Sequence, residues 1–230
     1  MNQQLALAIQ LNDEATLDDF HWGENLLLQQ HLTMLLEHQN HKRFVYLWGI
    51  PGSGKSHLLQ ACCQAYKHGQ AIYLPLRLLK DLGPQVMDNL DEQALICIDD
   101  IDAIASCSNW EETLFHLYNR VHDNEHSKLI ISSQTPPASS TIQLADLKSR
   151  LGWGLVIQLH ELSDNDKIET IQHHAQKRGF ELPTGVMQFL IHRCDRNMHD
   201  LHHLLNRLDE TSLAAQRKIT IPFVKHVLNL

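Results

Sequence analysis

Residues 49–56 read GIPGSGKS and complete the pattern G-x-x-x-x-G-K-[ST] of a phosphate-binding loop. An apolar run at 44–48 precedes the loop and a helix-like stretch at 57–61 follows it, which is the context that the pattern requires. The glycines let successive backbone N–H groups turn toward a phosphate, and the positive end of the following helix adds to their attraction. Lys55 is then expected to reach the β- and γ-phosphates, and the Ser56 hydroxyl to ligate Mg²⁺. The loop therefore predicts a site for a nucleoside phosphate.

Two adjacent acids, Asp99 and Asp100, follow the apolar residues 96–98. At the end of a strand in a phosphate-loop protein, the first acid holds Mg²⁺ directly or through water, and the second orients and activates the attacking water. Apolar residues followed by two acids are also typical of a strand that leads into a solvated acidic turn. Their place beyond the phosphate loop favours the first interpretation, with Asp99 as a metal ligand and Asp100 as a catalytic residue.

The segments that must position these residues alternate between strand and helix patterns. The strand-like segments are apolar and short, as in a buried parallel sheet, and they lie at 44–48, 71–74, 94–98, 128–132 and 156–159. Beyond residue 162 only helical patterns follow, near 164–178, 184–193, 198–209 and 222–228. Ser163, with Asp166 three residues later, is a suitable N-cap for the first of these helices.

This alternation predicts an α/β fold with the layout of a AAA+ protein. We expect a parallel-sheet nucleotide-binding subdomain at 14–162, an all-helical lid subdomain at 163–230 and a flexible tail at 1–13. The 230 residues are enough for one large domain or two small ones.

Composition narrows the class of protein. The chain has 19 Lys and Arg against 27 Asp and Glu, a formal net charge of −8, which argues against a general nucleic-acid-binding surface. Five cysteines without a C-x-x-C pair, no signal peptide and no membrane-length apolar run predict a cytoplasmic protein with no membrane partner. The 17 histidines include helical spacings that could hold a metal, but no cysteine or carboxylate set completes a site, so we interpret them as solvated helix faces.

Three further segments resemble the DnaA-like AAA+ family, and the resemblance extends over residues 14–230. Residues 17–25 (LDDFHWGEN) look like that family's opening box, which cups adenine and ribose. Residues 146–155 (DLKSRLGWGL) closely resemble its arginine-finger box, which implies that Arg150 acts in trans as the finger; a surface ion pair with Asp146 is the alternative. Residues 195–201 (DRNMHDL) look like its sensor 2 helix.

The chain departs from DnaA at the residues that sense the γ-phosphate. Gln134 and Thr135 stand where DnaA has Asp-Arg at the end of the sensor 1 strand, and His199 stands at the sensor 2 arginine position. A neutral imidazole is a poor substitute for a guanidinium, although Arg196, about one turn earlier, can partly compensate. We therefore expect ADP or ATP with Mg²⁺ as cofactor. The residues expected to contact the nucleotide are Phe20, Gly23, Asn25, Gly49, Pro51, Gly52, Ser53, Gly54, Lys55, Ser56, His57, Gln134, Arg196 and His199.

The N-terminal residues 4–9 (QLALAI) are similar to the Q-L-x-L-x-L peptide that docks on the DNA polymerase sliding clamp. In such peptides the glutamine enters a small polar pocket and the apolar side chains fill a groove. The clamp-binding residues would then be Gln4, Leu5, Leu7 and Ile9. A disordered tail or an edge strand is the alternative.

Together these features resemble the Hda family, the regulatory inactivators of DnaA. The resemblance implies a negative regulator of replication initiation that, with the DNA-loaded clamp (the β subunit of DNA polymerase III), promotes hydrolysis of DnaA-bound ATP and is at most a weak ATPase itself. It implies DnaA and the clamp as partners, self-association through AAA+ faces as a further option, and no dedicated sequence-specific DNA-binding domain. Two alternatives stay open: a DnaA-like helicase loader, and an ATP-driven motor, against which His199 argues.

Overall fold

The computed structural model describes residues 11, 15–37, 42–194 and 196–228, except for the side chain of His199. The chain divides into two compact units, one formed by Met1–Ile50 with Gly54–His160 and the other by Glu161–Leu230 with Pro51–Ser53. The predicted clamp-binding residues Gln4, Leu5, Leu7 and Ile9 lie outside the described residues.

A five-stranded parallel sheet forms the first unit. Its strands are β1 (Phe44–Trp48), β2 (Ala71–Pro75), β3 (Leu95–Asp99), β4 (Lys128–Ser133) and β5 (Leu155–Gln158), in the order β2-β3-β4-β1-β5. Every residue of β3 and β4 is buried, which explains their continuous apolar runs. Because all strands are parallel, the ends of β1, β3 and β4 meet at one edge of the sheet, where the phosphate loop and the acids follow them. The predicted parallel α/β fold is confirmed.

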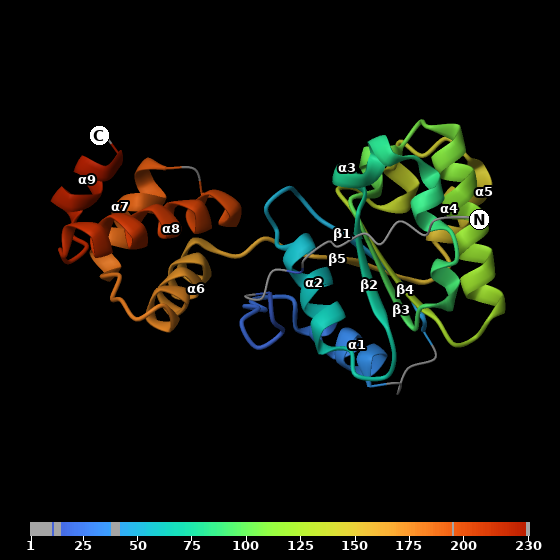
Figure 1. The fold of residues 1–230 in the computed structure, drawn as a ribbon, viewed down its shortest axis with the longest axis horizontal. Coiled ribbons are helices and arrows are strands. Elements are labelled where there is room, and N and C mark those ends of the chain that lie inside the picture. The colour runs from blue at the N-terminus through green and yellow to red at the C-terminus, as the bar shows by residue number, and fades with distance from the viewer. Residues whose placement is uncertain (1–10, 12–14, 38–41, 195, 229–230) are drawn as a thin grey trace. The chain divides into compact units, whose positions relative to one another are not determined.

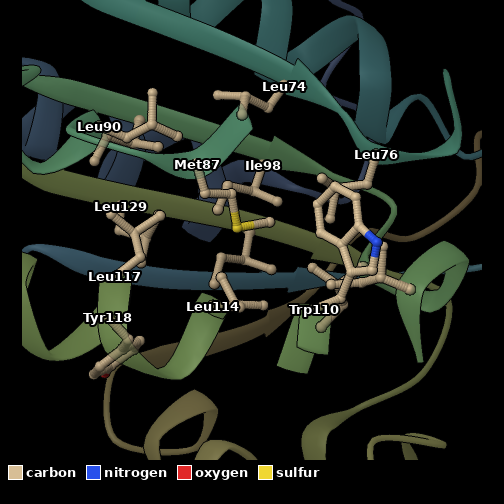
Figure 2. Packing of buried hydrophobic residues seen from close by; sticks show 14 of the residues in the cluster. Leu74, Leu76, Met87, Leu90, Ile98, Trp110, Leu114, Leu117, Tyr118 and Leu129 are labelled. Carbon is tan, nitrogen blue, oxygen red and sulfur yellow. The ribbon is translucent and has the colours of Figure 1, made fainter. Parts of the chain in front are cut away.

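Helices cover both faces of this sheet (Figure 1). They are α1 (Leu26–Leu36), α2 (Lys55–Ala65), α3 (Leu76–Leu79), α4 (Ser108–Asp123) and α5 (Ala145–Leu151). Apolar side chains of α1 and α2 form one buried cluster with the sheet. On the other face, Figure 2 shows Trp110, Leu114 and Leu117 of α4 beside Ile98 of β3 and Leu129 of β4. Five short 3-10 turns complete the described part of this unit, at Lys80–Leu82, Pro84–Met87, Leu90–Glu92, Ile101–Ile104 and Pro137–Ser139.

The second unit is helical and has its own apolar core. Its helices are α6 (Asp164–Lys177), α7 (Thr184–Arg193), α8 (Met198–Ala215) and α9 (Ile221–Leu228). A capping box starts α6 as expected: Ser163 Oγ accepts from the Asp166 N–H, and the Asp166 carboxylate accepts from the Ser163 N–H, both at 3.2 Å. The helix predicted at 198–209 is longer, since α8 continues through helix-forming residues to Ala215.

A buried carboxylate ties α4 to the segment that enters α5. Glu111 is 2 % exposed, and its two oxygens accept hydrogen bonds from the backbone N–H groups of Ser106 (2.7 Å), Gln143 (3.0 Å) and Leu144 (2.7 Å). Leu144 is the N-cap residue of α5 and has no side-chain cap of its own. Glu111 therefore satisfies the N–H group of the N-cap residue and of the residue before it, from more than thirty residues away in sequence.

We predict that Glu111→Ala lowers the free energy of unfolding by roughly 3 kcal/mol, because it strands several backbone donors that a charged acceptor now satisfies. Urea unfolding followed by circular dichroism measures the change. Glu112→Ala is the matched control, since Glu112 is the next residue of α4 and is exposed. A Glu111→Ala loss no larger than that of the control would contradict the assignment.

Candidate functional site

The phosphate loop joins the end of β1 to the start of α2. Gly52 and Gly54 have φ values of +80° and +98°, in the left-handed region that favours glycine. A Cβ on Gly54 would lie 3.2 Å from the ring of Phe20, so the N-terminal segment closely approaches the loop at this point. Gly54 is also the N-cap of α2, which has no side-chain cap, and the first N–H groups of that helix are available to an anion.

Lys55 lies against this loop. Its Nζ donates to the carbonyls of Gly49 (2.7 Å) and Ile50 (2.9 Å). Burial lowers the pKa of Lys55, while the nearby carboxylates of Asp99, Asp100 and Asp102 act in the opposite direction. The side chain is thus a cation held between the loop and the acidic edge of the sheet.

Asp99, the last residue of β3, has a donor on each carboxylate oxygen. Its Oδ1 accepts from the Ser132 hydroxyl, and its Oδ2 accepts from the Tyr73 hydroxyl at 2.7 Å. Ser132 also accepts the Asp100 N–H at 2.8 Å, so β4 supports both acids. The structure therefore places Asp99 at the sheet edge, in a defined orientation.

Asp100 is held by an arginine that follows β2. Its Oδ2 lies 2.6 Å from both Nε and Nη2 of Arg77, a two-nitrogen contact of the strong kind. Its backbone is in the left-handed region, at φ +60°. Asp100 Oδ1 and the phosphate-loop hydroxyl Ser53 Oγ are buried and have no hydrogen-bond partner among the described residues. Orphaned polar atoms in the loop and beside it fit a site that takes a polar ligand.

The predicted sensor 1 residue Gln134 lies directly beyond β4. Its N–H donates to Asp102 Oδ2 at 2.7 Å, and the Ser133 hydroxyl donates to the same carboxylate at 3.0 Å. Sequence reasoning did not select Asp102, Tyr73, Arg77 or Ser132. Asp102, Arg77 and Ser132 lie near or just beyond strand ends, which was a usable signal, whereas Tyr73 lies in the middle of β2. The pairing of these residues depends on strand order, which the local pattern does not contain.

The opening box is anchored to the same unit. The Phe20 ring contacts Trp22 edge-on at 4.7 Å and His57 at 5.7 Å. Asn25 is buried, and its side-chain amide donates to the His160 carbonyl (3.1 Å) and accepts from the His160 N–H (2.8 Å). Asn25 thus ties the box to the segment just beyond β5, at His160. Its contact with a nucleotide stays a prediction, as does that of Gly23, which lies in a turn with φ +48°.

Arg150 lies in the last turn of α5, and its guanidinium stacks on the indole of Trp153 at 3.8 Å from the ring centroid. Trp153 is 58 % exposed, and its backbone N–H donates to the Arg150 carbonyl at 3.0 Å. Arg150 forms no ion pair with Asp146 or another acid in the described part of the chain. The position after Trp153 requires glycine, because a Cβ on Gly154 would lie 2.4 Å from the Phe44 carbonyl oxygen.

Two further site predictions, Arg196 and His199, fall in the segment 161–230. The exposed Arg196 guanidinium lies 3.4 Å from Asp164 within that segment. The side chain of His199 lies outside the described residues. In the described part of the chain, no helix combines the length and the apolar character that crossing a membrane requires.

Known structures share this fold. Domain III of the Thermotoga maritima replication initiation protein DnaA is 22 % identical over 96 % of this chain and 98 % of that chain, with a TM-score of 0.82. AMPPCP-bound DnaA from Aquifex aeolicus is 22 % identical over 89 % of this chain and 68 % of that chain, with a TM-score of 0.70. The Thermotoga maritima RuvB Holliday junction branch migration motor is 16 % identical over 94 % of this chain and 71 % of that chain, with a TM-score of 0.65.

Two family models match separate parts of the sequence. The model for the lid domain of Hda matches residues 164–228. The model for the bacterial DnaA ATPase domain matches residues 78–158, which include the acids of β3 and the α5 segment. With the parallel sheet and the helical lid unit, these matches identify the chain as an Hda/DnaA-like AAA+ protein.

Proposed function

We propose that this chain is a negative regulator of replication initiation that, with the DNA-loaded sliding clamp, promotes hydrolysis of ATP bound to DnaA. The observation that carries the proposal is the state of Arg150: a guanidinium in a DnaA-type finger segment, without an acidic partner among the described residues. Its stack on an exposed indole is worth only about 0.5–1 kcal/mol. Leaving Trp153 for a phosphate therefore costs little.

Arg150 would act in the site of a partner. A guanidinium stabilises the charge that spreads over the γ-phosphoryl oxygens as the bond to the leaving group breaks. A finger of this kind contributes ~10³–10⁵ in rate, which corresponds to ~4–7 kcal/mol. The match to the Hda lid and the relation to DnaA support DnaA as that partner.

The chain's own site would hold ADP or ATP. The loop glycines, the uncapped start of α2, Lys55 and the orphaned Ser53 hydroxyl fit a nucleoside polyphosphate. Ser56 and Asp99 would hold Mg²⁺, which supplies positive charge beside the phosphates. Two solved DnaA structures contain AMPPCP, and the family relation supports an adenine nucleotide here.

Intrinsic hydrolysis would be weak. Arg77 engages Oδ2 of Asp100, the acid expected to orient the attacking water. The imidazole at position 199 replaces the guanidinium that a DnaA-type sensor 2 would supply. Both features reduce what the chain does with its own nucleotide, and neither affects a finger that acts elsewhere.

We predict that ADP binds at least as tightly as ATP, because the residues that would sense the γ-phosphate are altered. Lys55→Ala should weaken both nucleotides by about 10–100-fold, since it removes a charge-assisted contact worth roughly 1.5–3 kcal/mol. Isothermal titration calorimetry measures both effects, with Lys67→Ala as the control because Lys67 is exposed on the stretch between α2 and β2. ATP binding far tighter than ADP would refute the sensor argument.

We predict that Arg150→Ala slows the stimulated hydrolysis of DnaA-bound ATP by about 10³-fold, or to the unstimulated rate if that limit is reached first. Fold, nucleotide binding and clamp binding should persist, because the side chain contributes only an exposed stack. Single-turnover hydrolysis with clamp-loaded DNA measures the rate, and Arg217→Ala, an exposed arginine in the helical unit, is the control. Asp100→Ala should have little effect; if it abolished stimulation while Arg150→Ala kept it, the chain would be an ATPase in its own right.

We predict that Gln4→Ala, or Leu5→Ala combined with Leu7→Ala, abolishes clamp binding and leaves the core intact, because a short terminal peptide contributes little to packing. Surface plasmon resonance on immobilised clamp measures binding, and Gln3→Ala is the matched control. Equal binding by all variants would show that the tail is not the docking peptide, whereas helicase binding in its place would favour a loader.

A further inference from the structure

The Tyr73 hydroxyl lies between the two groups that would hold Mg²⁺. Tyr73 is in β2, outside both nucleotide-binding patterns, and its hydroxyl donates to Asp99 Oδ2 at 2.7 Å. The side chains of Ser56 and Gln60 in α2 lie within hydrogen-bonding reach of the same hydroxyl. One side chain therefore links the helix after the phosphate loop to the acid of β3.

The direction of these hydrogen bonds follows from the number of protons available. Tyr73 has one hydroxyl proton, and Asp99 can only accept, so that proton is directed to Asp99. Toward Ser56 the phenol oxygen can only accept, and Ser56 must donate. A phenol carries its proton at neutral pH, so this donor is present.

The other carboxylate oxygen of Asp99 is also hydrogen-bonded. Its Oδ1 accepts from Ser132, and Ser132 accepts the Asp100 N–H. The Ser132 hydroxyl thus has a defined donor and a defined acceptor. A serine that donates its only proton to Tyr73 keeps its oxygen lone pairs available to a cation.

We propose that Tyr73 is a positioning residue of the magnesium–nucleotide site, which acts by orienting the Ser56 hydroxyl and Asp99. This inference rests on the proposed nucleotide binding. Groups that orient metal ligands from outside the coordination shell typically change metal affinity by about 10–100-fold when removed. The expected signature is a loss in the contribution of Mg²⁺ to nucleotide binding, with the magnesium-free affinity unchanged.

The test compares ADP affinity in Mg²⁺ and in EDTA by isothermal titration calorimetry. In Tyr73→Phe, the ratio of the two affinities should fall by about tenfold, while the affinity in EDTA should stay within about twofold of the parent. Tyr46→Phe is the control, because Tyr46 is also a strand tyrosine with a hydrogen-bonded hydroxyl: it is buried, and its hydroxyl donates to the Thr135 carbonyl at 3.0 Å. Tyr46→Phe should have a melting temperature similar to that of Tyr73→Phe, but its ratio of ADP affinity in Mg²⁺ to that in EDTA should equal the ratio of the parent.

Ser56→Ala gives the second arm. It should lose most of the magnesium effect, and adding Tyr73→Phe to it should cause a smaller further loss than Tyr73→Phe causes in the parent, because only the part that acts through Asp99 remains. If the ratio in Tyr73→Phe is unchanged, Tyr73 contributes to packing alone. If the ratio is higher, the Tyr73 hydroxyl competes with the cation. Either result overturns the proposal. If the parent binds no ADP, the nucleotide site itself is wrong, which is distinct from binding that persists with an unchanged ratio.

Discussion

The arrangement of the first unit depends on one constraint: parallel strands end at the same edge of the sheet. The order β2-β3-β4-β1-β5 places β4 between the strand that enters the phosphate loop and the strand that ends in Asp99. Neighbouring strands end within a few ångströms of each other. At the end of β4, Ser132 therefore reaches Asp99 and Ser133 reaches Asp102. Tyr73 of β2 reaches the Asp99 carboxylate from the other side.

Two carboxylates, the partly buried Asp102 and the buried Glu111, then fix the loops that leave this edge. Asp102 accepts the Gln134 N–H beyond β4, and Glu111 accepts the N–H groups that precede α5. A carboxylate offers two oxygens and several lone pairs, so one side chain satisfies donors from segments far apart in sequence. Apolar packing would hold these segments less specifically, because it has no preferred direction.

The sequence alone predicted what local patterns encode. The phosphate loop, the apolar strands and the capping box at Ser163 each depend on residues a few positions apart, and the parallel sheet follows from their alternation. The pairing of Tyr73 with Asp99, or of Glu111 with Leu144, spans 26 and 33 residues and depends on strand order. Asn25 shows the other difficulty: the residue type fits a nucleotide contact and a backbone tie equally well, and the bonds to His160 show that it makes the tie, while its nucleotide contact stays a prediction.

The two arginines Arg77 and Arg150 have opposite surroundings. Arg77 is engaged with the acid that hydrolysis in this chain would need, and Arg150 has only an exposed indole beneath it. A finger gains ~4–7 kcal/mol from the charge of a phosphoryl transition state, against about 0.5–1 kcal/mol for the stack that it leaves. The two-nitrogen contact with Arg77 occupies Oδ2 of Asp100, so only its Oδ1 is left to orient water. Under the proposed function, the chain is thus better suited to complete the site of another protein than to operate its own.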